Sequence, residues 1–388
     1  TKKKFDKQAK YFGYICKKVF FMKGKIYSIF GLMILFFALP FQSAFSQRQK
    51  SFVCVKTIKS SQSRIHSAEF SPDGKYILSV AEDRMIKTRN ANNYQLRLVI
   101  EKHKRFFIST SFSNEGAVRK RICWDKDHQT LDPFSPNTLK GKRLYSADAK
   151  TASYSPDGKH IISVLRNGNI KIWDAISGKS LKTLKGHSSY VHSAEYSPCG
   201  KYIVSTSSDE TLKIWDANTG SCLQTLKGHK RNIYSAKYSP DGRHIVSASL
   251  DSTIKIWDAN TGKCLQTLEG HSKCVNTVEY SPCGKYIVSA SDDKTIKIWE
   301  ANTGICLQTL KGHSSYVFSA QYSPDCKQII SASLDKTIKI WDANSGNCLQ
   351  TLKGHEDSVI TAKYSPDGTK IISGSRDGII KIWKEIKK

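Results

Sequence analysis

The chain has 388 residues, with 61 Lys and Arg against 33 Asp and Glu, so its net charge is +28. This length is ample for a large buried core, and the basic excess predicts a surface that tolerates or seeks anions. None of the eleven cysteines forms a C-x-x-C pair. This excludes the ligand spacing of common zinc sites and of thioredoxin-like redox motifs, and no metal or cofactor is predicted.

The N-terminal part of the chain differs in composition from the rest. Residues 1–46 hold nine Lys and one Asp, and the balance from Gln47 onward is +20. Residues 1–21 are interpreted as a basic upstream extension that precedes a better start at Met22.

A targeting segment is predicted at residues 22–46. Two Lys precede an apolar run of 14 residues, Ile26–Leu39, and Ala44-Phe45-Ser46 places small residues where a signal peptidase cleaves. The segment is predicted to be a secretory signal cleaved before Gln47, which would export the protein to the periplasm or the cell exterior. The alternatives are an uncleaved membrane anchor, although the run is short for a span of about 20 residues, and a fortuitous apolar leader on a cytoplasmic protein.

A repeat with a period of 42 residues organises the rest of the chain. Gly-His pairs recur at 186/187, 228/229, 270/271, 312/313 and 354/355, and Trp recurs at 173, 215, 257, 299, 341 and 383. A strict period near 40 residues is typical of repeat architectures.

Each unit is predicted to form four short strands. In one copy the apolar and polar residues alternate over Ile233–Tyr238, His244–Ser249, Thr253–Trp257 and Lys263–Leu268. Turns rich in Gly, Pro, Asn and Asp separate these runs. Four strands per repeat, arranged in a ring, predict an all-β propeller with one blade per repeat.

The repeated motifs resemble those of the WD-repeat family. The Gly-His pairs, the Ser-Pro-Asp-Gly turns and the Trp-Asp pairs at 173/174, 215/216, 257/258 and 341/342 carry the resemblance. Trp299-Glu300 and Trp383-Lys384 depart only in the second residue. The resemblance covers residues 52–388 and implies a β-propeller domain at residues 47–388.

The number of blades follows from counting turns. Seven turns of the Ser-Pro-Asp-Gly type, three of them with Cys in place of Asp or Gly, and a degenerate Ser-Asn-Glu-Gly that starts at Ser113 fall in register, which favours eight blades. The second blade is degenerate, because only seven residues separate Gly116 from Trp124 where a regular repeat has fourteen. A seven-bladed ring without this region, the commonest form in the resembled family, is the alternative.

The two ends of the repeat region are each incomplete. Residues 52–60 match the fourth strand of a repeat, and the chain ends on a third strand at Ile380–Trp383. The N-terminal strand is therefore predicted to complete the last blade and to close the ring, which removes two exposed strand edges.

Five repeats carry His, Ser, Asp and Trp at fixed offsets. These types could suggest a Ser-His-Asp triad, but a nucleophile needs one specialised pocket, whereas five copies serve every blade alike. No catalytic residue is predicted. In the resembled family the four residues form a hydrogen-bonded network within a blade, which implies a structural role for His187, Ser205, Asp209, Trp215, His229, Ser247, Asp251, Trp257, His271, Ser289, Asp293, Trp299, His313, Ser331, Asp335, Trp341, His355, Ser373, Asp377 and Trp383.

The N-terminal repeats depart from this set. Arg89 stands at the Trp position and Ser60-Ser61 at the Gly-His position of the first repeat, and Asn167 stands at an Asp position. The blades that they form are expected to be the looser part of the ring.

The cysteines are interpreted as packing residues. One group is repeat-equivalent on fourth strands of different blades, beyond the roughly 7 Å that a disulfide can span. Its members are Cys54, Cys222, Cys264, Cys306 and Cys348. Cys199, Cys283 and Cys326 replace Asp or Gly in turns.

The partner-binding positions are predicted from variation between the copies within this chain. Residues on either side of the apolar residue after each Gly-His pair vary most, as does the residue before the network Asp. In the resembled family such positions ring the mouth of the central channel and bind partners. This implies a partner-binding role for Tyr190, His192, Asn232, Tyr234, Asn276, Tyr316, Phe318, Leu250, Leu334 and Arg376.

The sequence thus predicts a non-catalytic scaffold that binds a protein or peptide partner on the channel-mouth face. One alternative is binding of nucleic acid or an anionic surface through the basic propeller surface, where a Lys recurs in each Ile-Lys-Ile-Trp motif. Another is a propeller enzyme, which would need one blade with an unrepeated His, Asp or Glu pocket. A membrane is a partner only through an uncleaved N-terminal segment.

Overall fold

The structure is a computed structural model that describes residues 50–61, 63–83, 85–101, 107–112, 118–123, 149–165 and 167–386. The predicted basic extension at residues 1–21 and the signal segment at residues 22–46 lie outside the described residues, so both remain predictions. The described part of the chain is built from β-strands. It contains no helix long and apolar enough to cross a membrane.

The described strands form seven four-stranded antiparallel sheets and one two-stranded sheet. We name the four-stranded sheets blades A to G. Blade A is β2 (Ile65–Phe70), β3 (Tyr76–Ala81), β4 (Met85–Asn90) and β5 (Leu96–Glu101); blade B is β8 (Ala149–Tyr154), β9 (His160–Leu165), β10 (Ile170–Asp174) and β11 (Ser180–Leu184); blade C is β12 (Val191–Tyr196), β13 (Tyr202–Ser207), β14 (Thr211–Asp216) and β15 (Cys222–Lys227). Blade D is β16 (Ile233–Tyr238), β17 (His244–Ser249), β18 (Ile254–Asp258) and β19 (Cys264–Leu268); blade E is β20 (Val275–Tyr280), β21 (Tyr286–Ser291), β22 (Ile296–Glu300) and β23 (Cys306–Leu310). Blade F is β24 (Val317–Tyr322), β25 (Gln328–Ser333), β26 (Ile338–Asp342) and β27 (Cys348–Leu352); blade G is β28 (Val359–Tyr364), β29 (Lys370–Ser375), β30 (Ile379–Ile386) and β1 (Ser51–Lys59).

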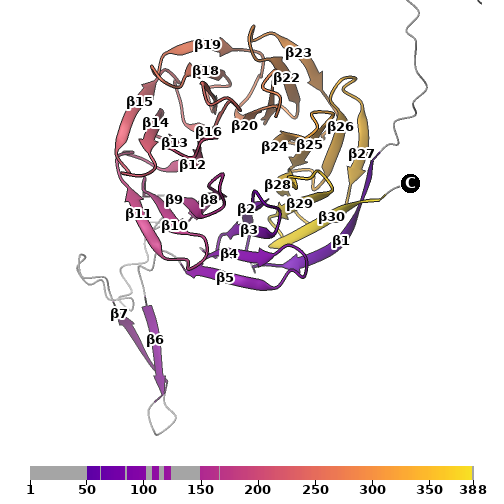
Figure 1. Cartoon of the computed structure of the whole chain (residues 1–388). Helices are drawn as coiled ribbons and strands as arrows, with labels where there is room; N and C mark the ends of the chain where they lie inside the picture. Colours follow the sequence, from indigo (N-terminus) through magenta and orange to yellow (C-terminus); the bar gives the residue numbers. More distant parts are fainter. Residues whose placement is uncertain are drawn as a thin grey trace, which may run out of the picture. The chain divides into compact units, whose positions relative to one another are not determined.

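The blades stand around a central channel (Figure 1), so the predicted propeller is confirmed. The first strand of each blade lies innermost and the fourth lies at the rim. The strands predicted for blade D agree with the structure to within one residue at each end. This agreement arises because the turn residues and the period-2 alternation fix both the ends and the faces of each strand.

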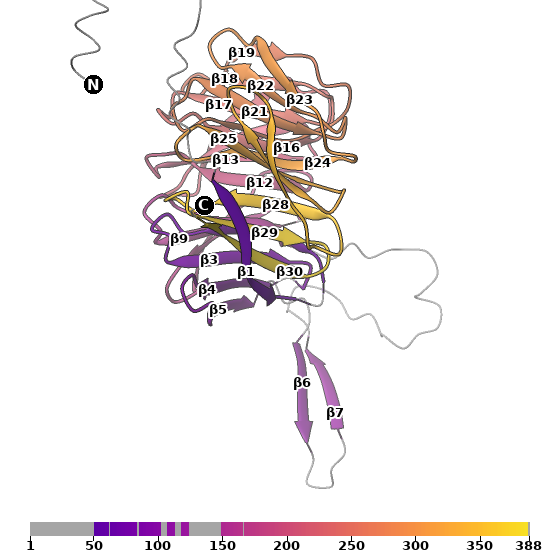
Figure 2. The ribbon, with the colours of Figure 1, turned by 90° about the vertical axis from the view of Figure 1, so that its right-hand side faces the viewer.

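The N-terminal strand closes the ring, as predicted. β1 pairs antiparallel with β30, from Ser51 opposite Ile386 to Lys59 opposite Ile379. Both views show the two strands side by side at the rim (Figures 1 and 2). Phe52 of β1 is 1% exposed and packs in the core between blades F and G. The first and last strands of the repeat region thus share one sheet.

The described residues form a ring of seven blades, which is the predicted alternative and not the eight blades of the main prediction. Blades A and B are direct neighbours, because Ile161 and Trp173 of blade B share one buried cluster with Leu78 and Val80 of blade A. The described residues of the degenerate region form only the two-stranded sheet of β6 (Phe107–Phe112) and β7 (Val118–Cys123). A repeat with a shortened central hairpin keeps the turn motif but does not supply a four-stranded blade.

The apolar core lies between the blades. In each regular contact the repeat Trp packs against the preceding blade, as Trp257 of blade D does against Val204, Leu212 and Ile214 of blade C. This packing favours Gly in the Gly-His pair, since a Cβ on Gly228 would lie only 3.1 Å from Cη2 of Trp257. At these regular contacts, neighbouring blades are therefore interlocked by one large aromatic ring.

A second, polar link joins the rims of successive blades. The Gln350 side chain accepts a hydrogen bond from the N–H of Phe52 at 2.9 Å and donates one to its carbonyl oxygen at 2.8 Å. Gln224, Gln266 and Gln308 at equivalent positions each donate to a backbone carbonyl of the next blade, that of Asn260, Asn302 and Asn344 respectively. These bonds join blades C to G in sequence around the rim.

Candidate functional site

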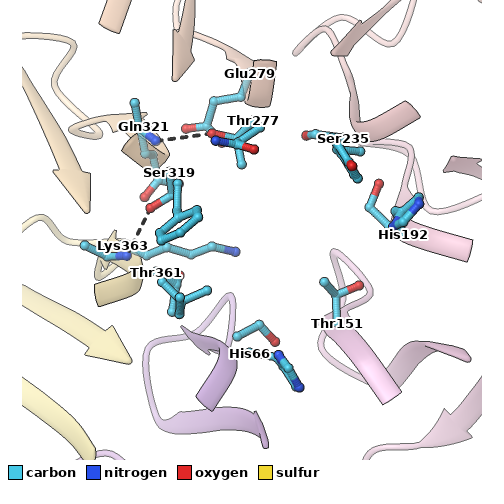
Figure 3. A pocket seen from close by; sticks show the side chains of 18 of the residues that line it. His66, Thr151, His192, Ser235, Thr277, Glu279, Ser319, Gln321, Thr361 and Lys363 are labelled. Carbon is cyan, nitrogen blue, oxygen red and sulfur yellow. Dashed lines mark hydrogen bonds between the residues drawn. The ribbon is translucent and has the colours of Figure 1, made fainter. Parts of the chain in front are cut away.

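The inner strands of the ring enclose a cavity of about 450 Å³. Figure 3 shows side chains from all round the ring projecting into it. The side chains that line the channel form three layers. A residue near the start of each first strand lies at the mouth, and two residues further along, which alternate and therefore face the channel, form the other two layers. We call these the mouth layer, the hydroxyl layer and the charged layer.

The mouth layer holds half of the predicted partner-binding residues. His192, Tyr234, Asn276, Phe318 and Arg376 all line the cavity. The rings of His192 and Tyr234 meet edge to face at 4.8 Å between centroids. The Arg376 guanidinium lies 5.5 Å from the centroid of the Phe318 ring. The structure thus brings these five residues, which come from five different blades, to one opening.

The other predicted binding residues lie near this opening without lining the cavity. Tyr190 and Tyr316 precede β12 and β24 and are 42% and 37% exposed. The Lys273 ammonium lies 5.7 Å from the Tyr316 ring centroid. The backbone carbonyl of Asn232 accepts a hydrogen bond from the N–H of Leu250 at 2.9 Å. The equivalent bond joins the N–H of Leu334 to the carbonyl of Tyr316. These residues form the loops that end on the same face.

Some mouth-layer side chains are held in place by the protein itself. The Asn276 side-chain amide donates to Asp292 at 2.7 Å and to the carbonyl of Val317 in the next blade at 2.9 Å. His192 is buried, and its Nε2 lies 2.6 Å from the Ser208 hydroxyl. The mouth is therefore a preorganised surface, in which Tyr190 and Tyr316 are the more exposed aromatic side chains.

The hydroxyl layer was not predicted. Each of the seven inner strands places a Ser or Thr at the same level, and all seven line the cavity. They are Ser67, Thr151, Ser193, Ser235, Thr277, Ser319 and Thr361. Several of these hydroxyls accept a hydrogen bond from the inner strand of the next blade. Thr277, for example, accepts one from the N–H of Ala320 at 3.3 Å. This layer gives the channel a continuous polar wall.

The charged layer was also not predicted, although its residues vary between copies as much as the chosen ones. It contains Glu69, Ser153, Glu195, Lys237, Glu279, Gln321 and Lys363. Lys237 pairs with Glu195, and Lys363 pairs with Glu69 at 2.7 Å. Among the described residues Glu279 forms no ion pair. Variation at this third inner position was the signal that sequence reasoning could have used.

Glu279 consequently differs from the other two carboxylates. Burial raises the pKa of Glu279 to about 7, and the negative charge of Glu195 acts in the same direction, while Lys237 and Lys363 oppose it. For Glu195 the pKa is lowered, since the charges of Lys237 and Lys363 outweigh the effect of burial. The layer therefore holds one carboxyl that titrates near neutral pH.

We expect the E279Q variant to become more stable than the wild type as the pH rises from about 5 to about 8. Folding raises the pKa of Glu279, so the neutral carboxyl stabilises the folded wild-type protein. This stabilisation is fully present below the unfolded pKa of about 4.3 and is lost as the pH rises through the folded pKa of about 7. The difference should reach about 2 kcal/mol at pH 8, reduced from the full shift because the carboxyl lines a cavity where solvent screens its charge. Urea unfolding of both proteins at pH 5 and pH 8 measures it.

The E195Q variant is the matched control from the same layer. Its carboxyl has a lowered pKa, so its stabilisation is already present above the unfolded value and E195Q should be less stable than the wild type at both pH values. A free-energy difference between E279Q and the wild type that does not change with pH would show that Glu279 is ionised throughout.

The predicted network is present in all five blades that carry its residues. In blade F the Nδ1–H of His313 donates to Asp335 at 2.7 Å, Nε2 lies 2.8 Å from the Ser331 hydroxyl, and the Trp341 indole donates to the same hydroxyl at 2.9 Å. Blades C, D, E and G repeat these contacts. Burial opposes ionisation of Asp335, yet hydrogen bonds from His313 and Thr337 lower its pKa. These side chains satisfy one another within the blade, and Ser331, His313 and Trp341 are all buried, as expected of a network that ties the strands together.

Blade A replaces the network with charges. Lys87 donates to the carbonyl of Ser60 and to Asp83, both at 2.7 Å. Arg89 occupies the Trp position, is 8% exposed, and has a buried nitrogen, Nη1, without a hydrogen-bond partner. Burial lowers the pKa of this Arg89 guanidinium. Blade A thus lacks the buried His–Ser–Trp contacts of blades C to G, and its greater looseness stays a prediction.

Four-stranded blades around a channel, five of them tied by the same His, Ser, Asp and Trp contacts, define a β-propeller repeat protein. The family model described as WD domain, G-beta repeat (WD40) matches residues 52–88, 136–174, 178–216, 220–258, 262–300, 304–342 and 346–384. The matches cover more than half of the chain, which belongs to this family. Propellers of the family are typically scaffolds that bind protein partners. No curated protein matches the chain.

Proposed function

We propose that this protein is a non-catalytic scaffold that binds a protein or peptide partner on the channel-mouth face of its propeller. The observation that carries the proposal is the gathering of copy-variable aromatic and polar side chains at one opening: Tyr190, His192, Tyr234, Tyr316 and Phe318. The fold does not demand aromatic residues there, since Asn232, Cys274 and Ile360 occupy equivalent positions in other copies. Rings gathered in this way are typical of binding hot spots.

The contacts of the repeated polar residues support a structural role for them. The His, Ser and Asp of each network bond to one another within the blade. The Lys of the Ile-Lys-Ile-Trp motif bonds to a Thr on the fourth strand in several blades, as Lys255 does to Thr267 at 2.7 Å. Neither set supports an enzyme or a nucleic-acid site better than a scaffold.

We expect the double variant Y316A/F318A to lose most of its partner binding. Hot-spot aromatic residues typically contribute about 2 kcal/mol or more each, so affinity should fall by roughly 30-fold for one ring and by several hundred-fold, on the order of 700-fold, if the two contributions add. The measurement is recovery of the partner that the full-length wild-type protein captures, followed by titration of that partner against both proteins.

The chain offers a matched control on the opposite face. Tyr202 and Tyr286 begin β13 and β21, at the other end of the blades, and are 41% and 37% exposed, much like Tyr190 and Tyr316. The variant Y202A/Y286A should keep wild-type affinity. Loss of binding in this control, with Y316A/F318A unaffected, would move the site to the other face. Capture of nucleic acid with a steep dependence on salt would favour the alternative function instead.

A further inference from the structure

Two cysteines depart from the repeat on neighbouring turns, a feature independent of the proposed function. The turn between β20 and β21 is Ser281-Pro282-Cys283-Gly284, with Cys at a position that is Asp in most copies. The turn between β24 and β25 is Ser323-Pro324-Asp325-Cys326, with Cys where the other six turns have Gly. The two departures are thus on blades E and F, which adjoin.

The fold directs the side chain at the glycine position toward the preceding blade. A Cβ built on Gly284 lies 3.8 Å from Cδ of Pro240, and one on Gly368 lies 3.6 Å from Cδ of Pro324, each a proline of the preceding turn. At Cys326 the corresponding proline is Pro282, whose next residue is Cys283. The Cys326 side chain therefore points at the turn that carries Cys283, and the two thiols lie close enough to affect each other's ionisation.

The backbone conformation at Cys326 does not favour a residue with a side chain. Its φ is +58°, in the left-handed region that the glycines of the other turns occupy. A residue with a Cβ is strained there. The turn hydrogen bond is the one found in the other copies, from the Cys326 N–H to the Ser323 carbonyl at 2.9 Å. Turn formation thus does not explain Cys326.

The surroundings of Cys283 favour a reactive thiolate. Its side chain is exposed, and its sulfur lies 3.3 Å from the Ser281 hydroxyl. Burial opposes ionisation, but hydrogen bonds from Ser281, from the N–H of Lys285 and from the Cys326 thiol lower the pKa of Cys283. A thiolate with a thiol beside it has the arrangement of an attacking and a resolving cysteine.

We propose that Cys283 and Cys326 form a thiol pair that closes to a disulfide between blades E and F by exchange with a disulfide oxidant. The Cys283 thiolate attacks one sulfur of the oxidant and displaces the other as a thiolate. The Cys326 sulfur, after losing its proton, then attacks the Cys283 sulfur of the mixed disulfide and displaces the second thiolate. Two protein thiols are oxidised and one disulfide is reduced to two thiols, so atoms and electrons balance.

Cys199 is the natural control for this pair. It occupies the position of Cys283 in blade C, and its sulfur also lies 3.3 Å from the hydroxyl of its turn serine, Ser197. The next blade, however, places Gly242 where Cys326 would be. Cys199 thus has the same attacking position without the resolving thiol.

The test is oxidation of the reduced full-length protein with glutathione disulfide, followed by non-reducing digestion and mass spectrometry. We expect a Cys283–Cys326 linked peptide at roughly tenfold lower oxidant concentration than glutathione addition to Cys199, because the second thiol acts intramolecularly. In the variant C326G, which restores the repeat residue, Cys283 should carry glutathione as Cys199 does.

Folding of the variant is monitored independently, since C326G relieves a strained φ and should not lower the thermal midpoint. Variant C199D, which restores the Asp of the other copies, should leave the Cys283–Cys326 link unchanged. Glutathione on Cys283 of the wild type with no linked peptide, at the concentrations that modify Cys199, would overturn the proposal.

Discussion

Deletion of residues 51–59 is expected to open the ring and to lower its stability on the order of 5 kcal/mol. The deletion removes the buried side chains of Phe52 and Ile58, which pack in two different inter-blade clusters. It also leaves the whole edge of β30 unpaired, because β1 is the only strand that pairs with that edge in the described sheet. Thermal unfolding followed by circular dichroism measures the loss, and gel filtration should show association through the free edge.

The control keeps the strand and changes only its outer face. Val53 and Val55 are 40% and 48% exposed, so replacing both with Thr should change the thermal midpoint little. A synthetic peptide of residues 50–60, added to the deletion variant, should restore part of the lost stability. If the deletion variant and the wild type unfold at the same temperature, β1 does not hold the ring closed.

The prediction of this closure shows what repetition in the sequence can establish. Because all copies share one register, the incomplete unit at each end of the repeat region revealed its missing strand. The strand boundaries followed for the same reason. Ile233–Tyr238 and His244–Ser249 were predicted as they are observed, since turn residues bound each run on both sides.

Blade number could not be obtained in the same way. The Ser113 turn is in register, but a turn motif does not show whether the adjoining strands reach an apolar partner. The structure decides this through Trp173, which packs directly against Leu78 and Ile86 of blade A. The number of blades therefore depends on contacts between blades, which the period of the sequence does not encode.

The candidate site shows the same division. Variation between copies identified mouth residues such as Tyr234 and Phe318, which do line the cavity. It did not identify the Lys363–Glu69 pair or the meeting of Cys283 with Cys326, because these contacts join different blades. Their geometry depends on the angle between neighbouring sheets, which a repeat pattern does not encode.

The largest effect of a single substitution is expected for S331A in blade F. The Ser331 hydroxyl is fully buried and lies between His313 Nε2 at 2.8 Å and the Trp341 indole at 2.9 Å. Its removal leaves two buried polar groups unpaired, at about 1–3 kcal/mol each, so the free energy of unfolding should fall by about 2–5 kcal/mol. Urea unfolding of the variant and the wild type measures the change.

Equivalent serines in the N-terminal blades make this prediction a graded series. Within the described part of the chain, the Ser163 hydroxyl of blade B accepts the Trp173 indole N–H at 2.9 Å and has no His partner, in a blade whose sequence has Asn167 at the Asp position. Ser79 of blade A has Arg89 in place of the Trp, and its hydroxyl makes one long contact of 3.4 Å, to the carbonyl of Lys87. All three serines are at most 2% exposed. The same Ser→Ala change therefore differs between them mainly in the polar groups that it leaves without a hydrogen bond. The loss should therefore be largest for S331A, intermediate for S163A and smallest for S79A, and equal losses would assign the cost to the cavity rather than to the network.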